Sequence, residues 1–490
     1  MKLKELLKGM EARIPRHLPE ADIKHVSADS GRVRKGSLFV AIRGSEFDGH
    51  EFIGKALKKG AGAAISERAL AGNENVIRVR DSRKALSRIA KNFYGAPAEK
   101  LKTIGITGTN GKTTVSFLAE SILKEAGMPA GLIGTIGYRS GRNIAPAAGT
   151  TPGPLELNRI LYGIAKKKMK AVVMEVSSHA LDQGRTADIF FDTAIFTNLT
   201  AEHLDYHRNM REYLSSKARI FANLKKDGFA VLNADDKNVK KCEKSVPAGN
   251  RVTYGLKKPA EVTAEVIKSG LDGSCFIIKA KNRVSFPINT RLPGLYNVSN
   301  ILAAAATGIA WGISPAVIKR GIEKVNNISG RLEPVEAGQP FRVFVDYAHT
   351  HGALLNVLKC LKSNKTGRII TVFGCGGERD RKKRPLMGLV ASRFSDYVIV
   401  TDDNPRREDP GAITGQIEKG INKKNVKYDV IHDRRKAIEK ALKTASAGDI
   451  VLIAGKGHEK SQIIGTTAIP FDDKQVTMEV LSRQVTVSTS

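Results

Sequence analysis

A glycine-rich segment, Gly105–Thr114, holds the residues whose types and spacing best fit a chemical task. It lies between a short apolar run, Leu101–Ile106, and a segment with helical periodicity. Glycines let the backbone curl so that several N–H groups face one anion, and the following helix adds the positive end of its dipole. Lys112 could reach the outer phosphates, and the Thr113 hydroxyl could bind Mg²⁺. The segment therefore predicts binding of a nucleoside triphosphate.

The phosphate-binding loop so predicted comprises Gly108, Thr109, Asn110, Gly111, Lys112, Thr113 and Thr114. The match to the P-loop pattern is not strict, because Ile106 stands where the first glycine is usual. A glycine turn that merely joins a strand to a helix is the alternative. The helical spacing of Val115, Leu118 and Ile122 favours the phosphate loop, since it supplies the required helix.

Polar residues also follow two other predicted strands, Ala171–Val176 and Thr193–Phe196. In doubly wound sheets, ligands bind where the carboxyl ends of strands release such residues, so Glu175 and Asn198 should join Lys112. A carboxylate at that place suits Mg²⁺, which prefers oxygen ligands. A salt-bridge role for Glu175 is the alternative.

Histidines and one lysine in the next segments are ambiguous. His203 is a candidate metal ligand, although a histidine alone is a weak signal for Mg²⁺. His179 could equally be a ligand or a satisfied core histidine. The sequence alone gives Lys217 no role beyond that of an exposed helix lysine.

Further candidates for nucleotide binding precede or begin the last third of the chain. Asn297 could contact an adenine edge with its donor and acceptor atoms, or simply cap a helix. Arg331, at a predicted hinge, could reach a phosphate across a domain gap. Asp346, at the end of a predicted strand, could hold ribose or phosphate.

A second group of charged residues could form an amino-acid pocket. Arg384 and Arg406 are possible bidentate carboxylate donors, and Asp403 and Glu459 are possible acceptors for an ammonium group. Two arginines with two acids would suit a zwitterionic amino acid. The alternative is that all four are solvated loop charges.

The elements that must position these residues indicate an α/β protein of three domains, as a length of 490 residues allows. We expect a small α/β domain over 1–98, a central P-loop parallel-sheet ATPase domain over 99–334, and a Rossmann-like domain over 335–490. The third domain should have strands at Val343–Val345, Ile369–Phe373, Tyr397–Thr401 and Ile450–Ala454. Shorter strands over Arg251–Pro287 suggest an insertion in the central domain.

The amino-acid composition further limits the kind of protein that this chain can be. No apolar run is long enough for a membrane span, and four scattered cysteines indicate neither a zinc site nor a disulfide framework, so we expect a reduced, cytoplasmic protein. The formal net charge is +31. Nucleic-acid binding, steering of polyanionic substrates and a solvated lysine-rich surface all fit that charge. The dispersion of the basic residues favours the solvated surface.

Taken together, the motifs resemble the Mur ligase family, ATP-dependent enzymes that form amide bonds in cell-wall peptide synthesis. The resemblance covers nearly the whole chain and is closest to the branch that adds the third residue of the peptide. The matching segments are Asp29–Ser30, Gly36–Ala41, the phosphate loop, Gly149–Pro152, Glu175–His179, His203–His207, Asp346–Thr350, Asp403–Arg406 and Gly455–Glu459.

The resemblance implies roles that spacing does not provide. ATP is the nucleotide, Lys217 is carbamylated by CO₂, and Thr113, Glu175, His203 and the carbamate serve Mg²⁺. The residues implied to hold UDP-N-acetylmuramoyl-L-alanyl-D-glutamate are Ser30, Thr150, Thr151, Ser177, Gln183 and Arg185. Those implied to hold meso-2,6-diaminopimelate are Arg384, Asp403, Asn404, Pro405, Arg406, Gly455 and Glu459.

The implied reaction passes through an acyl phosphate, which the amine of diaminopimelate attacks; His207 or His179 could take up its proton. Two departures from the family pattern stand out: Gly31 precedes Arg32 near the uridine site, and His351 replaces a usual proline. A relative that adds L-lysine is the first alternative, and a basic P-loop protein that binds nucleic acid is the distant one. We expect a monomer without nucleic acid.

Overall fold

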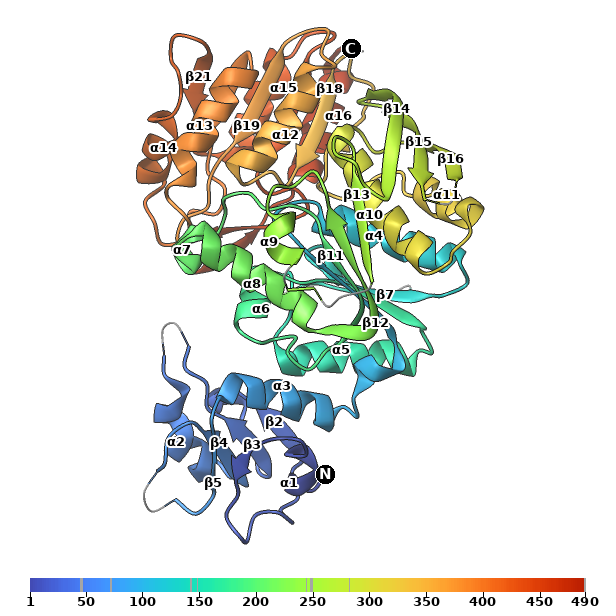
Figure 1. The fold of residues 1–490 in the computed structure, drawn as a ribbon. Coiled ribbons are helices and arrows are strands. Elements are labelled where there is room, and N and C mark those ends of the chain that lie inside the picture. Colours follow the sequence, from blue (N-terminus) through green and yellow to red (C-terminus); the bar gives the residue numbers. More distant parts are fainter. Residues whose placement is uncertain are drawn as a thin grey trace.

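The computed structural model describes residues 1–44, 47–70, 73–141, 143–147, 149–243, 245–246, 250–281 and 283–488. Three sheets follow one another along the chain, and helices cover each of them (Figure 1). The α/β class with large, mainly parallel sheets is thus confirmed. The boundaries at 98/99 and 334/335 stay predictions.

The first sheet has five strands in the order β1-β5-β4-β3-β2, all parallel except β1. Its central strands are buried on both faces: Leu38 and Val40 enter one apolar cluster and Phe39 enters another. The elements are α1 (Leu3–Leu6), β1 (Ala12–Arg13), β2 (His25–Ser27), η1 (Ser30–Arg32), β3 (Ser37–Val40), η2 (Gly49–Phe52), α2 (Ile53–Lys58), β4 (Ala63–Ser66), β5 (Val76–Val79) and α3 (Ser82–Phe93).

The central sheet has eleven strands in the order β16-β15-β14-β13-β12-β11-β6-β10-β7-β8-β9, and its middle strands are parallel. Its strands are β6 (Lys102–Thr107), β7 (Ala130–Gly134), β8 (Gly137–Ser140), β9 (Asn143–Ala145), β10 (Ala171–Glu175), β11 (Phe191–Phe196), β12 (Leu224–Asn233), β13 (Arg251–Gly255), β14 (Val262–Gly270), β15 (Gly273–Ala280) and β16 (Val284–Thr290). The shorter strands predicted over Arg251–Pro287 are present, and because β13 pairs with β12 they extend the central sheet.

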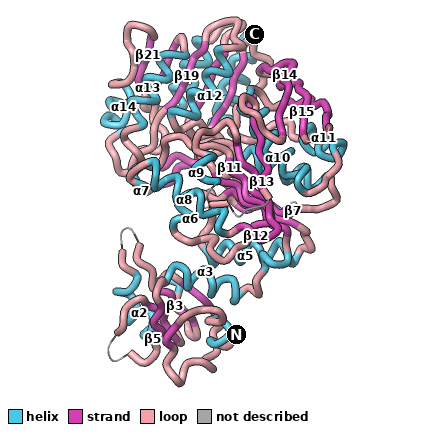
Figure 2. The backbone as a smooth tube through the Cα atoms, in the orientation of Figure 1, coloured by secondary structure: helices cyan, strands magenta, loops and turns pink. Residues whose placement is uncertain are grey.

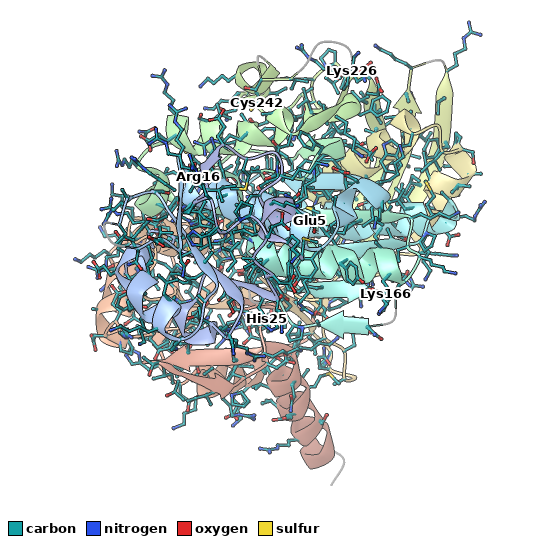
Figure 3. The ribbon with its side chains drawn as sticks, turned by 90° about the horizontal axis from the view of Figure 1, so that it is seen from below. Glu5, Arg16, His25, Lys166, Lys226 and Cys242 are labelled. Carbon is teal, nitrogen blue, oxygen red and sulfur yellow. The ribbon has the colours of Figure 1, made fainter. Side chains whose placement is uncertain are left out.

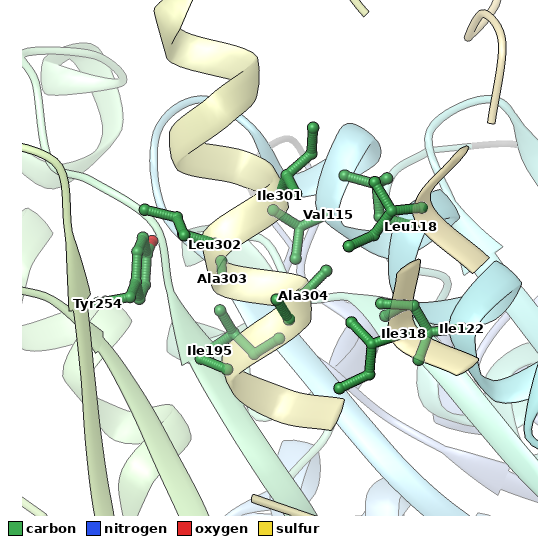
Figure 4. Packing of buried hydrophobic residues seen from close by; sticks show 14 of the residues in the cluster. Val115, Leu118, Ile122, Ile195, Tyr254, Ile301, Leu302, Ala303, Ala304 and Ile318 are labelled. Atoms are coloured by element: carbon green, nitrogen blue, oxygen red, sulfur yellow. The ribbon is translucent and has the colours of Figure 1, made fainter. Parts of the chain in front are cut away.

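Helices pack on both faces of this sheet (Figure 2). On one face, Ile122 of α4 lies beside Ile318 of α11, whereas Leu302 of α10 points toward Tyr254 of β13 (Figure 4). The 3.6-residue spacing of the apolar positions in α4 accounts for this packing. The helical elements are η3 (Pro97–Lys100), α4 (Lys112–Glu125), α5 (Pro154–Lys166), α6 (Ser178–Asp182), α7 (Leu204–His207), α8 (Met210–Ala222), α9 (Val239–Glu243), α10 (Leu295–Ala310) and α11 (Pro315–Glu323).

The third sheet has six strands in the order β17-β18-β22-β19-β20-β21, parallel except for β17, with a separate hairpin β23-β24. The elements are β17 (Glu333–Pro334), β18 (Arg342–Asp346), α12 (His351–Lys362), β19 (Ile369–Phe373), α13 (Lys383–Phe394), β20 (Tyr397–Val400), α14 (Pro410–Glu418), β21 (Lys427–Val430), α15 (Arg434–Thr444), β22 (Ile450–Ala454), β23 (Ser461–Ile464), β24 (Thr467–Pro470) and α16 (Asp473–Ser488). The four strands predicted here are all present.

Surface charge is dispersed over the molecule. Lys166 and Lys226 lie at separate places on its rim (Figure 3), and both are exposed. Within the described part of the chain, no helix is both long and apolar enough to cross a membrane.

Candidate active site

The phosphate loop joins β6 to α4, and close packing fixes its shape. Gly108 has φ 138° and Gly111 has φ 87°, both left-handed values that favour glycine. A side chain at Gly111 would collide with the amide oxygen of Asn300. Asn198, at the end of the neighbouring strand, accepts from the backbone N–H of Thr109 at 2.8 Å and from that of Asn110 at 2.9 Å. The conformation of the loop is therefore fixed both by its own glycines and by contacts with Asn198 and Asn300.

Two lysines converge on one carbonyl of this loop. Lys112 Nζ donates to the Gly108 and Thr109 carbonyls at 3.0 and 2.9 Å, and Lys217 Nζ donates to the Gly108 carbonyl at 2.7 Å. Burial, and then the charge of Lys112, lower the pKa of Lys217 well below its usual value. Burial also lowers the pKa of Lys112. An anion bound here would stabilise the charged lysines, since it would offset the positive charge that burial disfavours.

Glu175 gathers oxygen atoms beside the loop. This carboxylate is 1% exposed and accepts from the hydroxyls of Thr113 at 3.1 Å and Thr135 at 3.0 Å, and from the Thr135 backbone N–H at 3.1 Å. Arg331, which precedes the third sheet, donates to the Thr113 hydroxyl at 2.8 Å. The structure thus brings Thr113, Glu175 and Arg331 together. Sequence reasoning missed Thr135, although it follows the end of β7.

His203 and Lys217 lie in an aromatic cluster on the other side of the loop. The His203 ring stands at the edge of His179 with centroids 4.7 Å apart, and Lys217 Nζ lies 4.7 Å from the Tyr213 ring centroid. Tyr213 in turn hydrogen bonds to the Thr109 hydroxyl at 3.2 Å. Burial lowers the pKa of His179 and that of His203 to about 4, so both are neutral at pH 7.

Glu202 is a second carboxylate here, largely but not fully buried, and sequence analysis gave it no role. It lies 3.3 Å from His349 of the third unit and 3.7 Å from His203. Burial alone would raise the pKa of Glu202, but the hydrogen bond from His349 and the nearby cations hold it far below its usual range. Among the described residues, no three His, Cys, Asp or Glu side chains are grouped so as to bind a metal ion. A metal ion at this site would therefore need further ligands.

The residues expected to hold the acceptor substrate form one hydrogen-bonded network, apart from Ser30. The Thr135 hydroxyl donates to that of Thr150 at 3.1 Å, the Thr151 hydroxyl donates to the Glu175 carbonyl at 2.9 Å, and the Ser177 N–H donates to Thr151 at 3.0 Å. Arg185 donates to the Thr151 carbonyl at 2.7 Å and to the Gln183 side chain at 2.7 Å.

Ser30 belongs to the first unit, where its carbonyl accepts from Lys59 at 3.0 Å. Arg83 of the same unit approaches the network closely enough for its charge to lower the pKa of Arg185, although burial contributes more. Arg88 also binds Asp188 across this junction at 2.5 Å. The first unit therefore borders the network through its arginines.

Loops of the third unit bring most of the expected amino-acid residues together. Asn404 donates to Glu459 at 2.9 Å, and the fully buried Lys456 binds both Asn404 and Glu459 at 3.1 Å. Arg406 donates to the Gly377 carbonyl at 2.7 Å, and a side chain at Gly377 would collide with the Pro405 carbonyl. A side chain at Gly455 would come within 2.6 Å of the Asp403 carboxylate, so these loops are closely packed. Lys456 is a further residue that sequence reasoning missed.

Three predicted residues already have internal partners. Arg384 is fully buried and binds Glu408 at 2.5 Å and Gln416 at 2.9 Å. Asn297 donates to the Pro293 carbonyl at 2.9 Å and accepts from Asn300 at 3.1 Å. Asp346 accepts from the N–H groups of Leu332 and Ala348 at 2.5 and 2.8 Å, and burial raises its pKa. Substrate roles for these three residues stay predictions.

A phosphate loop on one parallel sheet, facing the loops of a second parallel sheet, defines a nucleotide-dependent enzyme of several α/β units. Three family models match the chain: "Mur ligase family, catalytic domain" over residues 22–94, "Mur ligase middle domain" over 106–308 and "Mur ligase, glutamate ligase domain" over 330–457. The chain belongs to the Mur ligase family of ATP-dependent enzymes. The resemblance noted in the sequence is confirmed.

One relative, the UDP-N-acetylmuramoyl-L-alanyl-D-glutamate--2,6-diaminopimelate ligase of Caldanaerobacter subterraneus subsp. tengcongensis, is 42% identical over 98% of this chain and 99% of its own length. A solved structure of an enzyme with the same name is 33% identical, with a TM-score of 0.69 and 99% of both chains covered. MurF ligase from Thermotoga maritima, solved in complex with ADP, is 20% identical with a TM-score of 0.65 over 95% of this chain and 98% of its own, and it shares the fold.

Proposed function

We propose that this chain is an ATP-dependent ligase that joins meso-2,6-diaminopimelate to UDP-N-acetylmuramoyl-L-alanyl-D-glutamate in peptidoglycan precursor synthesis. One observation carries the proposal most strongly. The carboxylate of Glu175, beside the phosphate loop, is joined through Thr135 to Thr150 of the acceptor network. A phosphoryl donor and an acid acceptor would therefore meet at this point. Similarity over the full length to an enzyme with this activity in its name supports the choice of substrates.

The first step is transfer of the γ-phosphoryl group of ATP to the γ-carboxylate of the D-glutamate. A carboxylate is a poor electrophile, and the acyl phosphate gives it a leaving group. Lys112 exchanges its two loop carbonyls for phosphate oxygens, and Arg331, already at Thr113, adds a second cation. Charge gathers on the transferring oxygens, and fixed cations stabilise it.

Mg²⁺ fits the oxygen donors at this place. The Thr113 hydroxyl and the Glu175 carboxylate lie 3.1 Å apart beside the loop, and both are ligand types that Mg²⁺ prefers. When bound, Mg²⁺ supplies charge stabilisation at the phosphoryl oxygens. His203 is the further side-chain ligand we propose.

Carbamylation of Lys217 suits its surroundings. An ammonium group cannot bind Mg²⁺, but burial lowers the pKa of Lys217 and so favours the neutral amine. A neutral amine can add to CO₂, and the resulting carbamate is an oxygen ligand. The modification would also replace one of two neighbouring cations with an anion.

The remaining residues hold the two substrates that become joined. Ser30, Thr150, Thr151, Ser177, Gln183 and Arg185 bind the nucleotide-linked dipeptide; Arg384, Asp403, Asn404, Pro405, Arg406, Gly455 and Glu459 bind diaminopimelate. Asn297 and Asp346 complete the nucleotide site. Arg384 is paired with Glu408, whereas the Arg406 side chain donates hydrogen bonds to the carbonyls of Gly377 and Asn404.

We place the reaction in the cytoplasm and propose that it needs neither nucleic acid nor a second subunit. A phosphate-release assay tests the proposal, with ATP, Mg²⁺, the UDP-linked dipeptide and a panel of amino acids. Phosphate release that depends on diaminopimelate, with a product of the corresponding mass, is the expected result. A preference for L-lysine would mean that L-lysine, and not diaminopimelate, is the amino-acid substrate. If no amino acid gives a new amide, the ligase assignment is refuted.

A further inference from the structure

His458 connects the amino-acid loop to the phosphate side of the site. It precedes Glu459 in the loop that follows β22, and its ring packs on Tyr347 with centroids 4.9 Å apart. Its ring also lies close enough to the backbone of Thr135, in the central unit, for that backbone to influence its pKa. Thr135 contacts both Glu175 and Thr150. His458 thus stands between the place proposed for the activated acid and that proposed for the amine.

The position of this histidine is fixed by its surroundings. A side chain at Gly330 would collide with the backbone nitrogen of His458, so the loop and the segment leading to β17 are in close contact. Tyr347 is covered on its ring by Arg331, whose guanidinium carbon lies 4.9 Å from the centroid. A ring held in this way presents its nitrogen atoms in fixed directions.

The two ring nitrogens of His458 differ. The nearby Thr135 backbone raises the pKa of His458, since a carbonyl stabilises a protonated ring. Nδ1 is buried and has no hydrogen-bond partner among the described residues. In the neutral ring one nitrogen carries the proton and the other has a free lone pair. With the proton on Nε2, Nδ1 is a buried, unused acceptor.

The neighbours of His458 keep its ring neutral. Burial, and then the charge of Arg331, lower the pKa of His458 to about 4, against the opposing effect of the Thr135 backbone. His349 and Lys460 also face it and act in the same direction as Arg331. The lone pair on Nδ1 is thus available at neutral pH.

We propose that His458 is a catalytic residue whose Nδ1 accepts the proton of the attacking amine; this rests on the function proposed above. The amine lone pair forms the C–N bond to the acyl carbon while one N–H proton passes to Nδ1. The C–O bond to the phosphoryl group then breaks, and phosphate leaves with the electron pair. Nδ1 returns its proton to the departing phosphate or to water.

His179 and His207 are less well placed for this step. Both lie in the aromatic cluster with Tyr213, in the central unit. His458 alone of the three is part of the loop that contains Gly455 and Glu459. Of these histidines it is the one that the proposed amino-acid substrate would meet directly.

Separate assays of the two half-reactions test the proposal. Acyl phosphate formation is measured without amino acid, as hydroxamate trapped by hydroxylamine, and ligation is measured with diaminopimelate. His458→Gln keeps an amide N–H that can donate to the Thr135 carbonyl but lacks a basic nitrogen. We expect wild-type hydroxamate formation and a ligation kcat about 10²–10⁴-fold lower, the range of general-base effects. Added imidazole should raise the ligation rate of His458→Ala.

The controls separate the possible failures. His17→Gln, in the first unit, should leave both half-reactions unchanged, and the melting temperature of each variant reports folding. Full ligation by His458→Gln would overturn the proposal, because the Thr135 contact would then suffice. Loss of hydroxamate formation in a folded His458→Gln variant would also overturn it. If the wild-type protein forms no hydroxamate, the proposed function itself fails and this inference falls with it.

Discussion

Arg406 offers the sharpest test of the amino-acid pocket. Its guanidinium is half-buried, donates to the Gly377 carbonyl at 2.7 Å, and contacts the Asn404 carbonyl at 3.4 Å. Both of these hydrogen-bond acceptors are uncharged carbonyls, so a substrate carboxylate would add a hydrogen bond to a charged group. A hydrogen bond to a charged group contributes roughly 1.5–3 kcal/mol. Since about 1.4 kcal/mol is a factor of ten, Arg406→Ala should raise the KM for diaminopimelate roughly 10–150-fold.

The assay is phosphate release at saturating ATP and UDP-linked dipeptide, with diaminopimelate varied. The KM for ATP should change little, because the phosphate loop lies on another sheet. Arg407→Ala is a matched control, since Arg407 is the adjacent arginine and is exposed. An unchanged KM for diaminopimelate in Arg406→Ala, or an equal increase in Arg407→Ala, would refute the reasoning.

Three further predictions concern the loop and the histidines. Lys112→Ala should abolish phosphate release although the protein stays folded; retained activity would contradict the phosphate-loop assignment. Gly111→Ala should lower the melting temperature and raise the KM for ATP, because the left-handed backbone costs roughly 1–2 kcal/mol and the new side chain meets Asn300; unchanged values would contradict this. Burial lowers the pKa of His179 and His203 from 6.5 to about 4, so the unfolded chain takes up more protons between these values. Stability should therefore fall as pH falls from 6.5 to 4, and melting curves of a His179→Gln/His203→Gln variant should show a flatter pH dependence.

Sequence patterns predicted those parts of the site that depend on a single element. The apolar run before Gly105 and the helical spacing after Lys112 fixed β6, the loop and α4, since each signal is local. The rule that ligands meet at strand ends placed Glu175 and Asn198 beside the same loop, where the structure has them. That rule also applies to Thr135, one residue past the end of β7, and could have found it.

Contacts between units could not be predicted in this way. The contact of Glu202 with His349 and the approach of His458 to the Thr135 backbone each join the central unit to the third. Their formation depends on how two sheets dock. The hydrophobic periodicity of a single helix or strand does not indicate that arrangement. The internal pairing of Arg384 with Glu408 is similar, because the sequence showed an arginine in a charged loop but not its burial.

The shared carbonyl of Gly108 shows what such tertiary contacts add to a motif. Lys112 reaches it from the loop itself and Lys217 from α8, more than a hundred residues later in the chain. Either lysine alone would be an ordinary buried cation with a backbone partner. Together they repel each other where water is excluded, and burial lowers the pKa of both. A bound triphosphate would draw Lys112 toward the phosphates, whereas a carbamate on Lys217 would remove the second positive charge. Both proposed changes relieve the same repulsion, so whichever occurs second gains less from that relief than the first.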